Sequence, residues 1–241
     1  MVSLSLSTLD QLPKGIERPR YARDGLRGGI LHIGVGNFHR GHQAVYLDRL
    51  FNAGRDHDWA IVGAGVRAAD NAMRDALMAQ DWLTTVVEQG ADSSRASVTG
   101  AMVEFVPPSN PEALLERLAD PAIRIVSMTI TEGGYFINPS SGDFDAADRN
   151  ILKDAANPEA PETVFGLLGL ALARRRAAGR PAFTVMSCDN IPHNGVVARN
   201  AVVGLAKLHD PDLAAWIDGE ATFPNAMVDR IVPATTDAQR H

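Results

Sequence analysis

The sequence has few of the residues that disulfide-linked or metal-binding proteins need. Its single cysteine, Cys188, excludes an internal disulfide and a cysteine-based zinc cluster. The 7 histidines are scattered and show no ligand spacing such as H-E-x-x-H, so we predict no metal site. Because a free cysteine usually behaves as a small apolar residue, we expect Cys188 to be partly buried and not to act as a nucleophile.

Long apolar runs and an excess of positive charge are also absent. No run approaches the ~18–20 apolar residues of a membrane span, and the first residues lack the basic and apolar parts of a signal peptide. The formal net charge of -6 argues against a nucleic-acid partner, because binding phosphates requires a basic surface. We therefore expect a cytoplasmic protein, without a membrane partner, that binds a small soluble metabolite.

Residues 30–41 have the pattern of a strand, a glycine turn and a helix. The apolar residues 30–33 lead into Gly34-Val-Gly36, and apolar residues then recur at helical spacing. Backbone N–H groups in such a turn meet an anion, and glycine at the closest point leaves room for a pyrophosphate. A dinucleotide is the natural ligand. His39 replaces the third glycine of the usual fingerprint, so the same pattern also fits a glycine-rich turn of any α/β protein.

An acidic residue, Asp70, follows a second predicted buried strand at residues 60–66. An acidic side chain at this point of a βαβ unit receives the adenosine ribose hydroxyls. The usual offset from the glycines is about 20 residues, so the polar loop at residues 54–58 must absorb the longer spacing. Alternatively, Asp70 caps the following helix.

Segments of strand and helix pattern alternate along the chain, which predicts an α/β fold with a doubly wound, Rossmann-like, mostly parallel sheet. Residues 82–87 and 96–106 predict an antiparallel β insertion, either a hairpin or a pair of edge strands. Residues 137–161 are predicted to be rich in loops. The strands are expected near residues 30, 61, 124 and 182, and the helices over residues 42–51, 67–78, 110–118, 163–179, 198–208 and 211–217.

Three consecutive arginines, residues 174–176, end the helix predicted over residues 163–179. Cations in the last turn are stabilised by the helix dipole, and this favours a solvated turn. The alternative is an anion-binding site. We expect residues 1–28 to form an irregular lead-in with one short helix from Leu9, residues 29–235 to form a single NAD(P)-binding domain, and residues 236–241 to form a tail.

Four long motifs occur along the chain: GVGNFHRGHQ at residues 34–43, TITEGGY at 129–135, FTVMSCDNIPHNG at 183–195 and FPNAMVDRIVP at 223–233. Together they resemble the polyol-specific long-chain dehydrogenases, a family that includes mannitol 2-dehydrogenase and the fructuronate and tagaturonate reductases. The resemblance runs from about residue 28 to 235. It implies NAD(P)-dependent hydride transfer between the secondary CH–OH of a sugar alcohol and a ketose. The alternative is a non-catalytic NAD-binding or interaction module.

The resemblance also implies roles for individual residues. Asn190 would hydrogen-bond the reacting oxygen, and Asp229 would lie close to the catalytic centre. The carboxylate of Asp70 would repel a 2′-phosphate, which favours NAD over NADP, although Arg67 nearby would soften that preference. The predicted cofactor-binding residues are Gly34, Gly36, Asn37, Phe38, His39, Arg40, Asp70, Glu132 and Gly133.

The general base of that family is missing from this sequence. In the family it is a lysine of a K-x-x-x-L-N-x-x-H motif in a helical C-terminal domain, whereas the last lysine here is Lys207, in a different context. We therefore expect the chain to be a cofactor domain whose C-terminal helical partner domain is absent. General-base assistance typically contributes ~10²–10⁴-fold, so we expect these residues to bind NADH without turning over mannitol or fructose.

Overall fold

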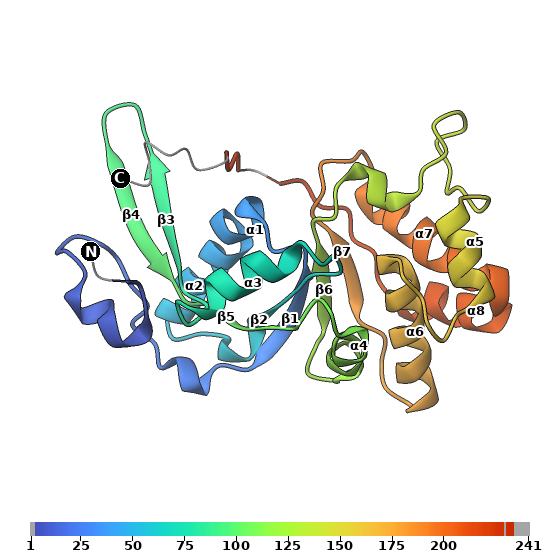
Figure 1. Cartoon of the computed structure of the whole chain (residues 1–241), viewed down its shortest axis with the longest axis horizontal. Coiled ribbons are helices and arrows are strands. Elements are labelled where there is room, and N and C mark those ends of the chain that lie inside the picture. The colour runs from blue at the N-terminus through green and yellow to red at the C-terminus, as the bar shows by residue number, and fades with distance from the viewer. Residues whose placement is uncertain (1–2, 229, 234–241) are drawn as a thin grey trace.

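Five parallel strands form the central sheet, in the order β5-β2-β1-β6-β7 (Figure 1). The structure is a computed structural model that describes residues 3–228 and 230–233. Each strand pairs in parallel with its neighbours, so the chain returns through crossover connections, as the alternating pattern predicts. The strands are β1 (Gly28–Ile33), β2 (Ala60–Ala64), β5 (Met102–Phe105), β6 (Ile125–Met128) and β7 (Thr184–Ser187).

Helices cover both faces of this sheet. On one face Phe51 and Leu77, from α2 and α3, pack against Ile61 and Phe105. On the other face a larger core joins the strands to α4, α6 and α7, and α5 and α8 pack against α7 (Figure 1). The doubly wound, Rossmann-like fold is therefore confirmed. The helices are α1 (Asn37–Gly41), α2 (Gln43–Asn52), α3 (Asp70–Met78), α4 (Pro111–Ala119), α5 (Arg149–Ala156), α6 (Val164–Ala177), α7 (Asn194–His209) and α8 (Pro211–Glu220).

The antiparallel insertion is a hairpin of β3 (Thr84–Gln89) and β4 (Ser94–Thr99) that extends away from the body (Figure 1). The prediction of one strand over residues 96–106 is wrong, because β5 leaves the hairpin and joins β2 in the main sheet. Two contacts distant in the sequence make this break. The buried carboxylate of Asp48 accepts a hydrogen bond from the Gly100 N–H at 2.8 Å, and Ala101 O accepts one from the Ile61 N–H at 2.9 Å.

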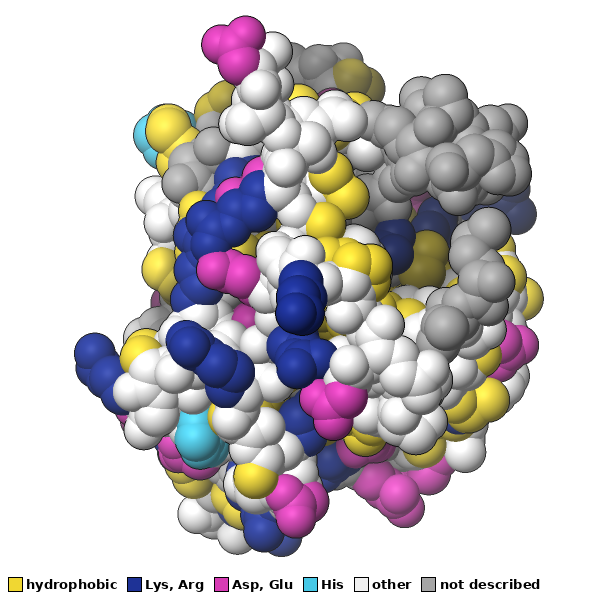
Figure 2. Space-filling model, turned by 90° about the vertical axis from the view of Figure 1, so that its left-hand side faces the viewer, with side chains coloured by type: hydrophobic (Ala, Val, Ile, Leu, Met, Phe, Trp, Pro, Cys, Tyr) yellow, Lys and Arg dark blue, Asp and Glu magenta, His cyan; other side chains and the backbone are white. Residues whose placement is uncertain are grey.

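Basic side chains and scattered acidic side chains share the face of the molecule at the hairpin end (Figure 2). Ion pairs around the hairpin include Arg49 with Glu88 of β3 at 3.0 Å and Arg95 of β4 with Glu17. Exposed pairs of this kind contribute little to stability. They link the hairpin to α2 and to the lead-in, which contains two short 3₁₀ helices, η1 (Leu6–Gln11) and η2 (Arg23–Gly25).

The segment predicted to be rich in loops, residues 137–161, also contains helix α5, which the sequence did not predict. Asp148 caps the helix by accepting a hydrogen bond from the Asn150 N–H at 2.7 Å, and Ile151 is fully buried. The helix is short and flanked by turns, and burial against the core is what stabilises it. Within the part of the chain that the structure describes, no helix combines the length and apolar character that crossing a bilayer requires.

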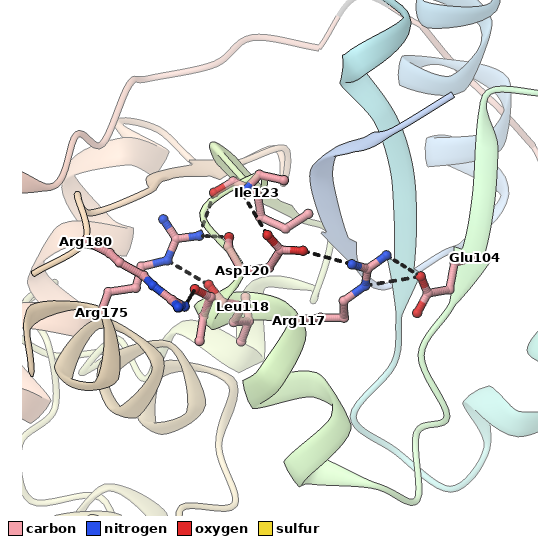
Figure 3. Close-up of polar contacts among 9 residues, drawn as sticks. Glu104, Arg117, Leu118, Asp120, Ile123, Arg175 and Arg180 are labelled. Carbon is pink, nitrogen blue, oxygen red and sulfur yellow. Dashed lines mark hydrogen bonds and ion pairs between the residues drawn. The ribbon is translucent and has the colours of Figure 1, made fainter. Parts of the chain in front are cut away.

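The solvated reading of the three arginines is wrong for Arg175, which is 1% exposed. Its guanidinium lies between α6 and the end of α4, where it donates to backbone carbonyls (Figure 3). Arg174 instead pairs with Glu112 at 2.6 Å, and Arg176 is exposed. A buried cation is tolerated here because carbonyl oxygens replace the water around it. Arg175 therefore holds α6 against the turn between α4 and β6.

Candidate functional site

The carboxyl ends of β1 and β6 meet at the point where the direction of winding reverses. Ile33 at the end of β1 lies opposite Ala64 of β2 on one side and Met128 of β6 on the other. The chain runs from β1 towards β2 and β5, and β6 begins the opposite half of the sheet. Open α/β sheets bind ligands in the crevice at such a reversal.

Gly34 begins the turn after β1 in a conformation that only glycine adopts without strain, with φ +93°. Its N–H donates to Ala64 O at 2.9 Å. A Cβ at this position would lie 2.1 Å from the backbone oxygen of Thr129, well inside contact distance. Gly34 is therefore required by both its backbone conformation and its close approach to the end of β6.

Gly36 differs from Gly34 because the space beside it is open. Its φ of -96° suits any residue, and a Cβ would have only Gly34 O among described atoms, at 3.9 Å. The Arg40 guanidinium lies at the same turn, where it donates to Gly36 O at 3.2 Å and bonds the side chain of Asn37. Burial lowers the pKa of Arg40, yet an arginine stays charged. An open space beside a fixed positive charge suits an anion.

Two buried histidines support the turn from within. The rings of His32 and His39 stack at 3.6 Å, nearly parallel. His32 Nδ1 lies 2.8 Å from Ser127 Oγ, and Nε2 lies 3.2 Å from Gly34 O. Burial lowers the pKa of His32 to about 3 and that of His39 well below its ordinary value, so both are neutral at pH 7. His39 is 1% exposed, and its predicted contact with a cofactor stays a prediction.

We expect the fold to lose stability as the pH falls from 6.5 to 5. In the unfolded chain both histidines bind protons near pH 6.5, whereas in the folded chain they stay neutral. Each histidine lowers the free energy of unfolding by at most ~1.4 kcal/mol for every pH unit below its unfolded pKa. Urea unfolding at several pH values measures this slope. His39→Gln should reduce the slope. An unaltered slope in His39→Gln would contradict this assignment.

A cavity of about 460 Å³ opens beside Gly34, between the ends of β2 and β6 and helices α5 and α6. Asp70 lines it as the first residue of α3. Its carboxylate accepts hydrogen bonds from the N–H groups of Val66 at 3.1 Å and Arg67 at 3.0 Å, and the Arg67 guanidinium lies 3.4 Å away. Asp70 thus holds the turn after β2 instead of capping α3, whose N-cap is Ala69.

A second, open hollow lies on the other side of the loop that follows β6. Thr131 lines both the cavity and the hollow, and Glu132, Gly133 and Asn190 line the hollow. These four residues are exposed. The structure therefore brings Asn190, Glu132 and Gly133 to the same sheet edge as Gly34 and Asp70. Within the described residues no three His, Cys, Asp or Glu side chains are grouped to hold a metal ion.

Asp229, predicted near the catalytic centre, lies outside the described residues. The chain before it is fixed by the buried Asn194, whose amide accepts from the Ala226 N–H and donates to Ala226 O, at 2.9 and 2.8 Å. After it, Arg230 donates to Gly41 O at 3.0 Å beside α1. The segment after α8 thus crosses the carboxyl edge from α7 to α1 (Figure 1).

Four further residues at this site were not predicted to have a role: His32, Thr131, Asp189 and Asn194. Asp189 accepts hydrogen bonds from the loop after β6, and Asn194 is 1% exposed. Both lie in the stretch after β7, where polar residues are frequent. That frequency is the one feature of the sequence that could have indicated a role for them. Sequence alone does not separate a buried polar side chain from a solvated one, because its partners come from other segments.

The strand order, the glycine turn and the crevice define a Rossmann-like domain. Residues 28–241 match the family described as "Mannitol dehydrogenase Rossmann domain", and the chain belongs to this family. The predicted resemblance is therefore confirmed.

Several relatives extend this match. The chain is 56% identical to a mannitol 2-dehydrogenase of Cereibacter sphaeroides over 95% of this chain and 48% of the relative. It is 49% identical to a polyol:NADP oxidoreductase of Gluconobacter oxydans, over 97% of this chain and 48% of that relative. Pseudomonas fluorescens mannitol 2-dehydrogenase, solved as a ternary complex with NAD and D-mannitol, superposes with a TM-score of 0.94 at 49% identity, over 98% of this chain and 49% of that one. The chain spans about half the length of these relatives.

Proposed function

We propose that residues 29–235 form the cofactor domain of an NAD-dependent oxidoreductase that transfers hydride between a sugar alcohol, with mannitol as first candidate, and its ketose. The observation that carries this proposal is that three features lie together at the carboxyl ends of the parallel strands. They are the turn at Gly34, the cavity lined by Asp70 and the hollow lined by Asn190. The printed names of the relatives, which are mannitol and polyol dehydrogenases, support the substrate class.

The residues present fit a dinucleotide. The open space beside Gly36 and the charge of Arg40 suit the pyrophosphate, and Asp70 at the cavity suits ribose hydroxyls. Glu132, Gly133 and Asn190 then lie on the side where the nicotinamide would face the substrate. A bound NAD would supply the hydride acceptor for alcohol oxidation.

The chain's own contribution to the chemistry is electrostatic. Negative charge develops on the substrate oxygen as the alcohol is oxidised, and the amide N–H of Asn190 would stabilise that charge. Asp229 would act beside it. The general base would come from the half of the relatives' length that these residues do not span.

Replacement of Asp70 by Asn is expected to weaken NADH binding about tenfold, an effect of ~1.4 kcal/mol, and to strengthen NADPH binding. The amide oxygen still accepts from the N–H groups of Val66 and Arg67, so the turn is kept while the charge that repels a 2′-phosphate is lost. Fluorescence titration of the chain with each cofactor measures both effects.

The matched control is Asp75→Asn, which removes an exposed charge from the same helix. It should leave both affinities unchanged. Undiminished NADH affinity in Asp70→Asn would show that Asp70 does not contact the cofactor. Equal weakening of the affinities for NADH and NADPH would show that Asp70 only supports the turn.

In a chain extended to the relatives' full length, Asn190→Ala should lower kcat by ~10²-fold or more while changing NADH affinity little. The amide bond strengthens only as charge builds on the oxygen, so the loss is specific to the transition state. Steady-state mannitol oxidation together with NADH titration separates the two effects. A variant with normal kcat would exclude Asn190 from catalysis.

A further inference from the structure

Asp189, at the end of β7, joins two segments that carry different parts of the proposed site. One carboxylate oxygen accepts from the Ile130 N–H at 2.9 Å and from the Tyr135 hydroxyl at 2.7 Å, and the other accepts from the Thr131 N–H at 3.1 Å. All three donors belong to the loop that follows β6. The carboxylate therefore fixes the backbone of that loop against β7.

The loop needs such a constraint because Thr131 has φ +66°, which is unusual for a residue other than glycine. Strained residues of this kind persist only where the surroundings hold them, and they cluster at ligand sites. Here the Thr131 N–H is held by Asp189, and Thr131 O accepts from the Gly134 N–H at 3.0 Å. Thr131 lies between the cavity with Asp70 and the hollow with Asn190 and lines both.

We propose that Asp189 is a positioning residue. It holds Ile130 and Thr131, which form one wall of the cavity, so that the nicotinamide half of a bound dinucleotide lies against Asn190. This inference rests on the proposed function. Asp189 and the next residue, Asn190, both line the hollow. The carboxylate of Asp189 is bonded to the loop, while Asn190 is exposed. One short turn thus fixes the wall and presents the amide. The adenosine half is held separately, by the turn at Gly34 and by Asp70.

The test compares two ligands, NADH and ADP-ribose, which differ by the nicotinamide. Asp189→Asn keeps the size of the side chain but replaces one acceptor oxygen with a donor, so at least one of the three hydrogen bonds is lost. We expect NADH to bind at least tenfold more weakly and ADP-ribose to bind within threefold of the wild type. Isothermal titration of the same preparation with both ligands gives the ratio.

Tyr135→Phe is the matched control. It removes the hydroxyl shared by Asp189 and Ser187 but keeps both backbone bonds to Asp189. It should lower the melting temperature and leave both affinities within threefold. Should Asp189→Asn not fold, Asp189→Glu keeps three acceptor contacts in reach but displaces the loop, and it should show the same preferential loss of NADH.

Unchanged NADH affinity in the Asp189 variant that folds would overturn the inference, as would equal weakening of NADH and ADP-ribose. A wild-type chain that binds neither ligand would instead overturn the proposed function. The two failures are therefore distinguishable in one set of titrations.

Discussion

Gly34→Ala is expected to destabilise the protein by about 2–5 kcal/mol, combining a left-handed backbone cost of about 1–2 with an overpacking cost of about 1–3. The reason is geometric: φ is +93°, and the new Cβ would meet Thr129 O at 2.1 Å. Because domains of this kind are stable by only ~5–15 kcal/mol, the variant should unfold at a clearly lower urea concentration than the wild type. Urea denaturation followed by circular dichroism measures the change.

Gly36→Ala is the matched control for that substitution, two residues further along the same turn. The added methyl meets only Gly34 O at 3.9 Å, and φ is -96°. We expect stability within ~0.5 kcal/mol of the wild type. NADH binding should nevertheless weaken at least tenfold, because the methyl occupies the space through which a pyrophosphate approaches the backbone. Equal stability of the two variants would contradict this account of the turn.

Arg175→Met is expected to cost about 3–5 kcal/mol of stability, the range for removing one partner of a buried charged network. The guanidinium donates to the backbone oxygens of Leu118 and Ile123, and in the variant these would lose their donor in an apolar interior (Figure 3). It also donates to the partly exposed backbone oxygens of Asp120 and Pro181. A buried acceptor without a donor loses the hydrogen bonds that water supplies in the unfolded chain. Denaturant unfolding again provides the measurement.

Arg176→Met, in the next residue of the same helix, is the control, and we expect a change within ~0.5 kcal/mol because Arg176 is exposed. Arg175→Lys should lie between the two, since an ammonium has three donors on one atom and does not reproduce the fork of the guanidinium. If Arg175→Met were as stable as Arg176→Met, the carbonyls would have to find other donors, and the role assigned to Arg175 would be wrong.

The sequence by itself determined the alternating strands and helices, the glycine turn and the family. These features are encoded locally: the apolar run before Gly34 and the helical spacing after it lie within about 20 residues, so periodicity and turn chemistry suffice to find them. The long motifs added the family, and the match over residues 28–241 bears that out. The residues predicted around Gly34, Asp70 and Asn190 do meet at one sheet edge, because parallel strands present their carboxyl ends together.

Tertiary structure alone decided which polar groups are buried and what they hold. The break before β5 follows from Asp48, 52 residues away from Gly100 in the sequence. The burial of Arg175 depends on carbonyls 52–57 residues away, and Asp189 meets Ile130 across 59 residues. A local pattern describes the neighbours of a residue along the chain, whereas the desolvation of a charge and the donors that compensate it are set by packing between distant segments.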